Sequence, residues 1–220
     1  MSELAEQLYG LYKAEIYTVL VNNDPQYQRS LAKAGVGWNV RAVPAGQRAS
    51  FEEEMKMQAW LGARRVEEAK SLEPATIRAK VLAGPTTLYR VSEEGSKAPI
   101  GIWWFGEQVA KRCRADVGGD GSKQLEWLRN VLAVCFNWSN FDRFERFSLH
   151  GGERIPAVLG KGSPMPQYKA DPYINRNTGE RVITLPKDYW RKKGDMLLGG
   201  ELQIVLPWIP VNKVSVTDHL

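Results

Sequence analysis

The sequence contains too few histidines and cysteines for several kinds of site. Two His and two Cys occur among 220 residues, at Cys113, Cys135, His150 and His219. This spacing does not resemble a zinc finger, and a four-ligand structural zinc site would require all four side chains. Two cysteines are also too few for a disulfide scaffold. We therefore expect chemistry without a metal, and reduced thiols in a cytosol-like compartment.

Long apolar runs and a strong charge bias are missing as well. No run of about 18 apolar residues occurs, so we expect no membrane insertion. The first residues, MSELAEQLYG, lack the basic and then apolar pattern of a secretory signal peptide. The chain carries 30 Lys and Arg against 25 Asp and Glu, a net charge of +5. That charge is too small to indicate a nucleic-acid binder, although it suits an acidic ligand.

Common catalytic and phosphate-binding motifs are not present. A serine triad would need His150 or His219, and neither accompanies a Gly-x-Ser-x-Gly elbow. The turn at 118–121, Gly-Gly-Asp-Gly, lacks the Lys-Ser/Thr of a P-loop. No dinucleotide fingerprint follows an expected strand. Serine hydrolases, P-loop enzymes and Rossmann enzymes are therefore not indicated.

The sequence does have enough aromatic side chains for a folded core, with eight Trp, eight Tyr and six Phe.

The first part of the chain, residues 1–84, is predicted to be helical. Apolar residues from Leu4 to Ile16 recur at helical spacing. A second helix is expected over 50–72, capped by Ser50, and a third from Pro74 to near Gly84. We interpret this region as a cap, a neck or a partner-binding part.

The second part, residues 85–220, is predicted to be an α+β catalytic domain. Short β-branched and aromatic runs indicate strands, and apolar periodicity predicts a helix over 122–137. The run 100–105 fits either a strand or the start of a helix. Strands are expected at 87–91, 143–149, 157–160, 181–185 and 202–206, with a helix from Pro186 before the last of them and a long loop over 160–178.

Three groups of residues in this part could carry chemistry. Arg90 interrupts an apolar strand, so it is either a solvated edge residue or a planar fork for a phosphate or carboxylate. The aromatic run 103–105, Trp-Trp-Phe, is either core or a stacking surface for a flat ring. Glu201 and Gln203 lie two apart at a strand start, so both point to the same face.

In this order, these runs resemble the ADP-ribosyltransferase fold of bacterial polymorphic toxins, in the branch of NAD glycohydrolases of the necrotizing-toxin type. The resemblance covers about residues 85–210. The matching runs are Leu88-Tyr89-Arg90-Val91, Gly101-Ile102-Trp103-Trp104-Phe105, Ile155-Pro156 through Gly160 to Gln167, and Gly199-Gly200-Glu201-Leu202-Gln203 through Pro207. The resemblance implies short strands that form a split sheet around an NAD cleft.

The resemblance also implies roles for these residues. Arg90 would hold the phosphates of NAD, the aromatic run 103–105 would wall the nicotinamide pocket, and Gln203 or Glu201 would hydrogen-bond the nicotinamide ribose. We would then expect Arg90→Ala to weaken NAD binding and leave the fold intact. The implied catalytic residues are Arg90, Glu201 and Gln203, and the implied substrate-binding residues are Tyr89, Trp103, Trp104, Phe105 and Gln167.

The expected substrate is NAD or NADP, and the expected reaction is hydrolysis to ADP-ribose and nicotinamide. Transferases of the fold usually have a glutamate where this chain has Gln203, and a glutamine cannot act as a base. Glu201 keeps mono-ADP-ribosyl transfer to a protein or nucleic acid open. The resemblance further implies an interbacterial toxin acting in the cytoplasm of a target cell, with an immunity protein that occludes the cleft.

A non-enzymatic module for nucleic-acid binding or phage assembly is the remaining alternative. Basic clusters at 111–114 and 191–193, with aromatic residues between them, would suit it. Solvated helix ends are the favoured explanation of such clusters, so the NAD-consuming toxin is the leading hypothesis.

Overall fold

The computed structural model describes residues 2–22, 48–92, 103–135, 141–167, 173–174, 181–182, 195–206 and 214–220. The helices are α1 (Glu3–Asn22), α3 (Arg48–Ala69), the short 3-10 helix η2 (Pro74–Thr76), α4 (Glu107–Val117) and α5 (Gly121–Val131). The strands are β1 (Arg78–Ala83), β2 (Thr86–Ser92), β3 (Trp103–Gly106), β4 (Arg143–Leu149), β5 (Arg154–Lys161), β6 (Met165–Pro166), β7 (Tyr173–Ile174), β8 (Arg181–Val182), β9 (Met196–Leu197), β10 (Leu202–Val205) and β11 (Ser215–Thr217).

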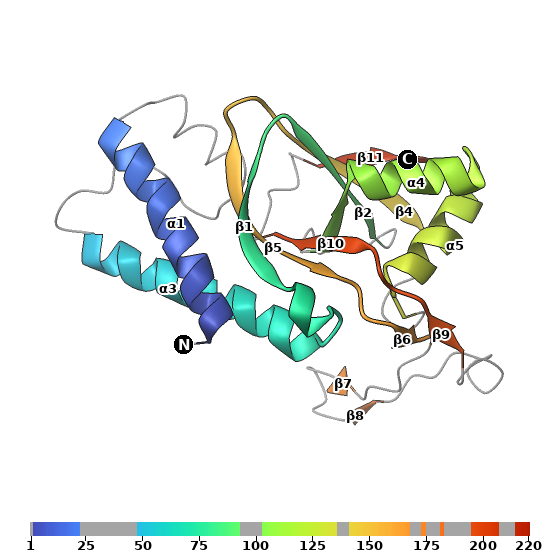
Figure 1. The fold of residues 1–220 in the computed structure, drawn as a ribbon, viewed down its shortest axis with the longest axis horizontal. Coiled ribbons are helices and arrows are strands. Elements are labelled where there is room, and N and C mark those ends of the chain that lie inside the picture. Colours follow the sequence, from blue (N-terminus) through green and yellow to red (C-terminus); the bar gives the residue numbers. More distant parts are fainter. Residues whose placement is uncertain are drawn as a thin grey trace.

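An antiparallel sheet of seven strands organises the fold, in the order β1-β5-β10-β3-β2-β4-β11. Two short pairs, β6 with β9 and β7 with β8, accompany it. Figure 1 shows α1 and α3 on one side of the sheet and α4 and α5 on the other. The α+β class predicted from the sequence is confirmed.

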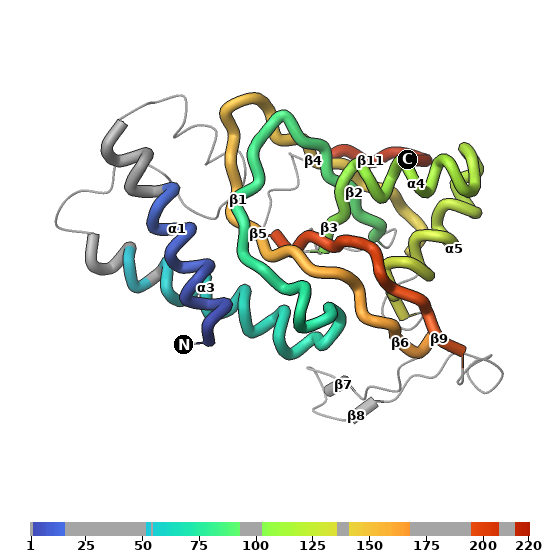
Figure 2. Tube along the Cα trace, in the orientation of Figure 1, coloured from blue at the N-terminus to red at the C-terminus, as the bar shows by residue number. Residues whose placement is uncertain are grey.

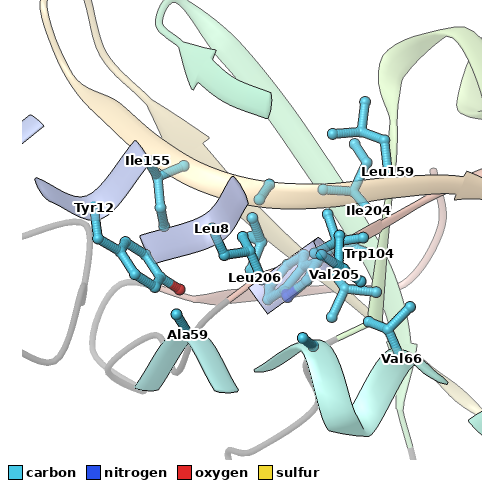
Figure 3. Close-up of a cluster of buried hydrophobic side chains, with 14 of the residues drawn as sticks. Leu8, Tyr12, Ala59, Val66, Trp104, Ile155, Leu159, Ile204, Val205 and Leu206 are labelled. Carbon is cyan, nitrogen blue, oxygen red and sulfur yellow. The ribbon is translucent and has the colours of Figure 1, made fainter. Parts of the chain in front are cut away.

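Helices α1 and α3 pack on each other and on one face of the sheet. Leu4, Leu8 and Tyr12 recur every four residues on α1 and are buried. On α3 the buried positions are Met55, Ala59, Ala63 and Val66. These side chains join those of β5, β10 and Trp104 on β3 in one core, named here the α1–α3 core (Figure 3).

A second core lies under α4 and α5. Tyr89 of β2 and Phe105 of β3 meet Val109 and Cys113 of α4 and Leu128 of α5. We refer to it as the α4–α5 core. Because adjacent residues of a strand point to opposite faces, the strands β2, β3 and β4 supply side chains to both cores.

The structure corrects two helix predictions in residues 1–84. Helix α3 begins at Arg48, so Ser50 lies inside the helix and does not cap it. The expected helix from Pro74 to Gly84 is wrong, since a single 3-10 turn is followed by β1. Exposed Arg78 and Lys80 alternate there with half-buried neighbours, the period of a strand, and six positions of β1 pair with β5.

The division predicted at residue 84 falls in the turn between β1 and β2, two strands of the same sheet. Residues 1–84 and 85–220 share the α1–α3 core. Helices α1 and α3 therefore cover one face of the sheet that residues 85–220 build.

Elements in residues 85–220 agree with the expected strands where they are described. The strands predicted at 87–91, 143–149, 157–160 and 202–206 correspond to β2, β4, β5 and β10, and the run 100–105 contributes β3. Helix α5 starts as expected but ends at Val131, because Ala133 has a positive φ of 53°. Helix α4 was not predicted. The expected helix from Pro186 lies outside the described residues.

Candidate functional site

The runs that carry the resemblance form neighbouring strands at the centre of the sheet, in the order β5, β10, β3 and β2. Figure 2 shows β5 and β10, orange and red, running side by side toward β6 and β9. Tyr89 lies opposite Phe105, and Phe105 lies opposite Gln203. Residues in register on adjacent strands share a face, so these three side chains form a row under α4 and α5.

Arg90 points away from that row. It directly follows Tyr89 on β2, so its side chain lies on the opposite face of the sheet. The contacts agree, since the Arg90 guanidinium lies 4.9 Å from the ring centroid of Trp104 in the α1–α3 core. The amide of Gln203, by contrast, bonds Leu132 at the end of α5. The structure does not bring Arg90 and Gln203 together.

Arg90 belongs to a buried ion-pair network. Its Nε donates to Oε2 of Glu145, which lies opposite it on β4. The hydroxyl of Ser92 donates to Oε1 of Glu145 at 2.8 Å, and Nη2 of Arg143 donates to the same oxygen at 2.6 Å. Burial alone would raise the pKa of Glu145, but these hydrogen bonds and the charge of Arg90 outweigh it and lower the pKa.

This network corrects one interpretation of Arg90. The residue is only 4% exposed and its strand lies between β3 and β4, so it is not a solvated edge residue. The planar fork is used on a carboxylate of the chain itself, Glu145. We therefore assign Arg90 a structural role, and a truncation of it should not leave the fold intact.

The three aromatic residues of β3 differ in their surroundings. Trp104 is 2% exposed, lies against Phe147 at 5.9 Å between ring centroids, and its Nε1 has no hydrogen-bond acceptor among the described residues. Phe105 stacks on Tyr89, also at 5.9 Å. Trp103 is half-buried and packs against the α1–α3 core. Trp104 and Phe105 are therefore core residues on opposite faces rather than one wall of a pocket.

Gln203 is buried at the end of the row. Its Nε2 donates to the carbonyl oxygen of Leu132 at 2.7 Å. A side chain at Gly162 would collide with this amide nitrogen, so the glycine allows the close approach. Gln203 thus ties β10 to the turn that follows α5.

Glu201 lies nearer to the surface, on the same side of the sheet as Gln203. Its carboxylate forms an ion pair with Nη2 of Arg112 on α4. The carboxylate side chain is 12% exposed and that of the arginine is 58% exposed. The pair therefore has its anion inside and its cation outside.

Glycines shape the backbone around Glu201. Gly199 and Gly200 have positive φ angles of 66° and 89°. The backbone of Gly200 donates to Gly162 at 2.8 Å, and that of Gly162 donates to Glu201 at 3.0 Å. Asn130 at the end of α5 accepts from the backbone N–H of Gly199 at 3.0 Å. These bonds hold the start of β10 between β5 and α5, and we call this region the Glu201 site.

The other two expected site residues, Gln167 and Tyr89, have different neighbours from Glu201. Gln167 follows β6, and its backbone N–H donates to Asp195 at 2.9 Å, while its Oε1 is buried without a donor among the described residues. The hydroxyl of Tyr89 donates to Glu107 at 2.6 Å, and Glu107 also accepts from Arg114 at 2.5 Å. Burial and the adjacent Glu107 raise the pKa of Tyr89.

The sequence analysis placed Arg112 only in the basic cluster 111–114, and it missed both helix α4 and the position of this arginine beside Glu201. The signal was present: Val109, Ala110 and Cys113 are buried at helical spacing, with charged residues between them. Glu145 was also missed; it lies on β4, directly opposite Arg90 of β2. Two opposite charges in two expected strands of one sheet are a signal for cross-strand pairing.

The described residues contain no group of three or more His, Cys, Asp or Glu side chains that could hold a metal ion. Among the helices of those residues, none has the length and apolarity needed to cross a bilayer. Burial raises the pKa of Cys113 to about 11, so this thiol is protonated near neutral pH.

In comparisons with protein-family models, curated proteins and solved structures, no match to this chain was found.

Proposed function

We propose that the protein cleaves the bond between nicotinamide and ribose in NAD(P), releasing nicotinamide and ADP-ribose. In this proposal the sheet with its flanking helices is a variant of the ADP-ribosyltransferase fold, and the reaction takes place at the Glu201 site. The protein would then be an NAD-consuming toxin acting inside a target cell.

One observation carries the proposal. Four runs that resemble the toxin family are separated by up to about a hundred residues along the chain, yet they occupy four neighbouring strands. Chance likenesses scattered along a chain have no reason to assemble side by side. This adjacency supports the resemblance, and the resemblance supplies the reaction.

The chemistry fits a site without metal or thiol. The bond from C1′ of the ribose to the pyridinium nitrogen breaks, and nicotinamide leaves as a neutral molecule with the bonding electron pair. No general acid is needed for this step. The transition state resembles an oxocarbenium ion, which an anion or a hydrogen-bond acceptor near the ribose stabilises. Water then adds to C1′ and loses one proton, which completes the hydrolysis.

We assign the role at the ribose to Glu201 rather than to Gln203. The Glu201 carboxylate forms an ion pair with the exposed Arg112 and lies close to the surface. The Gln203 amide is buried and already donates to Leu132, so it fixes β10 under α5. Arg90, on the other face, has no part in the reaction.

Transfer of ADP-ribose to an acceptor is the second candidate. It is favoured by the position of Glu201, because a carboxylate near the surface can also accept a proton from an attacking nucleophile. In transfer, C1′ bonds to the acceptor instead of to water. The acceptor gives up one proton, and nicotinamide leaves as before.

The test is to incubate the purified protein with NAD or NADP and to measure free nicotinamide, with and without cell extract. Release in buffer alone supports hydrolysis, and release only with extract supports transfer. Absence of nicotinamide at micromolar protein in both conditions would refute the proposed function.

A further inference from the structure

The ion pair between Arg112 and Glu201 places its cation toward solvent. The arginine side chain is 58% exposed, whereas the carboxylate side chain is 12% exposed. A negatively charged ligand that approaches the Glu201 site therefore meets the guanidinium first. The carboxylate lies behind it, against the glycine-rich start of β10.

Helix α4 has one other arginine, and its surroundings differ. Arg114 bonds to Glu107 at 2.5 Å, on the side of α4 near Tyr89, and its side chain is 34% exposed. Arg112 and Arg114 thus carry the same charge on the same helix, but only Arg112 pairs with Glu201 in the structure. The helix offers a matched pair of arginines for comparison.

The partner of Arg112 is exchangeable on physical grounds. The guanidinium side chain is 58% exposed, so water can solvate it when it leaves the carboxylate, whereas the largely buried carboxylate needs a new hydrogen-bond donor in its place. A guanidinium presents parallel N–H groups that fit two oxygens of a phosphate as well as two of a carboxylate. A diphosphate carries more negative charge than Glu201, so it can replace the carboxylate as the partner.

We propose that Arg112 binds the diphosphate of the substrate and, by leaving Glu201, frees that carboxylate for the ribose. This inference rests on the proposed function and adds to it a specificity-determining and positioning residue. The hydroxyls of the ribose then donate to the carboxylate in place of the guanidinium. Arg112 and Glu201 form the resting pair, and the substrate separates them.

A purely structural ion pair predicts a different pattern. Removing either partner would then lower stability, more so for the arginine because the carboxylate is largely buried, and would leave the affinity for a diphosphate unchanged. In the exchange proposed here, Glu201 competes with the ligand for Arg112. Removal of the arginine must weaken binding, and removal of the carboxylate charge must strengthen it.

The experiment measures the affinity of the full chain for ADP by calorimetry at fixed ionic strength. ADP contains a diphosphate and has no nicotinamide bond to break, so its binding does not depend on the cleavage reaction. Four variants are compared with the parent: Arg112→Ala, Arg112→Lys, Glu201→Gln and, as the matched control, Arg114→Ala. Circular dichroism and thermal unfolding establish that each variant is folded.

We expect Arg112→Ala to weaken ADP binding by at least about tenfold, the effect of losing a charge-assisted hydrogen-bond pair. Arg112→Lys should bind with intermediate affinity, because it keeps the charge without the fork. Glu201→Gln should bind ADP more tightly than the parent, and Arg114→Ala should bind like the parent.

The inference is overturned if the parent shows no saturable binding of millimolar ADP, if Arg112→Ala and Arg114→Ala weaken it equally, or if Glu201→Gln also weakens it. Failure of this inference can be distinguished from failure of the proposed function. Nicotinamide release that persists with an unchanged KM in Arg112→Ala refutes only the role of Arg112. If the variants bind ADP with the expected affinities but the parent releases no nicotinamide, only the cleavage reaction is refuted.

Discussion

At the scale of single residues, the fold contains a buried charge pair between Arg90 and Glu145, which we assign a structural rather than a functional role. Arg90 and Glu145 are 4% and 3% exposed and lie opposite each other on neighbouring strands. A buried charge without its partner is strongly destabilising, whereas a matched apolar pair at the same positions costs little. Such a pair therefore fixes which strands meet.

We predict that Arg90→Ala lowers the free energy of unfolding by about 3 kcal/mol, because it leaves the Glu145 carboxylate buried with less compensation. Chemical denaturation measures the change. As a control, the double substitution Arg90→Met with Glu145→Leu should regain most of the loss. If Arg90→Ala keeps the stability of the parent but no longer cleaves NAD, Arg90 is a functional residue and its structural assignment is wrong.

The same pair predicts a dependence of stability on pH. The pKa of Glu145 is lower in the folded chain than in the unfolded chain, so folding favours the ionised form. Its contribution is present above the ordinary glutamate pKa of about 4.3 and is lost as pH falls from there through the lower folded value.

Unfolding free energies measured between neutral pH and acid should therefore fall less steeply for Glu145→Gln than for the parent. Glu53→Gln, an exposed glutamate of α3, is the control and should follow the parent. Equal slopes for all three proteins would show that Glu145 is not stabilised as an anion in the fold.

At the scale of elements, the start of β10 depends on glycines. A Cβ at Gly199 would collide with the backbone of Gly162 and Ser163, whereas a Cβ at Gly200 would meet no atom within 4 Å. Both residues have positive φ, so both substitutions carry backbone strain. The collision is specific to Gly199.

We predict that Gly199→Ala destabilises the chain by about 2–3 kcal/mol and Gly200→Ala by about 1 kcal/mol. The first substitution should also displace Glu201 and lower nicotinamide release, while the second should largely preserve release. Denaturation and the release assay are run in parallel. A Gly200→Ala variant that is as unstable as Gly199→Ala would contradict the described backbone.

Elements with a clear period could be predicted from the sequence, and their arrangement could not. The spacing of Leu4, Leu8 and Tyr12 is sufficient for α1, and short runs with β-branched or aromatic residues are sufficient for β2, β4 and β10. Strand β1 was mistaken for helix because Pro74 suggested a first turn and the alternation at 78–81 is short. The separation of Arg90 from Gln203 follows from which strands are neighbours, and local patterns do not contain that information.

Part of the candidate site was predictable from the two-residue period of a strand. The period of a strand places the side chains of Glu201 and Gln203 on the same face. Their contacts agree, because Arg112 bonds Glu201 and Leu132 bonds Gln203 from that same side of the sheet. The pairing partners themselves could not be predicted. Arg112 is 89 residues from Glu201, and Leu132 is 71 residues from Gln203. Such contacts exist only once the sheet and α4 are in place.

At the scale of the whole molecule, the N-terminal helices and the sheet stabilise each other. Leu8 of α1 is 2% exposed and belongs to the same core as Trp104 and Ile204. Removal of the helices would expose this apolar face of the sheet to water. The chain should therefore unfold as one cooperative unit.

Accordingly, Leu8→Ala should lower the stability of the whole chain by about 3 kcal/mol through the cavity that it creates. Met57→Ala, at a residue of α3 that is 60% exposed, should change it by less than about 0.5 kcal/mol. Far-UV circular dichroism and tryptophan fluorescence should give the same midpoint for each variant. Separate transitions for helix and sheet in Leu8→Ala would mean that residues 1–84 fold independently.

The central claim is that the Glu201 site cleaves NAD(P), and nicotinamide release by Glu201→Gln tests it most directly. The substitution keeps the size of the side chain and removes its charge, and the lost pair with the exposed Arg112 costs little stability. We predict that the parent releases nicotinamide and that folded Glu201→Gln is slower by at least about a hundredfold, as for the loss of a charge that stabilises a transition state. Equal release by the two proteins, or no release by the parent, would contradict the account.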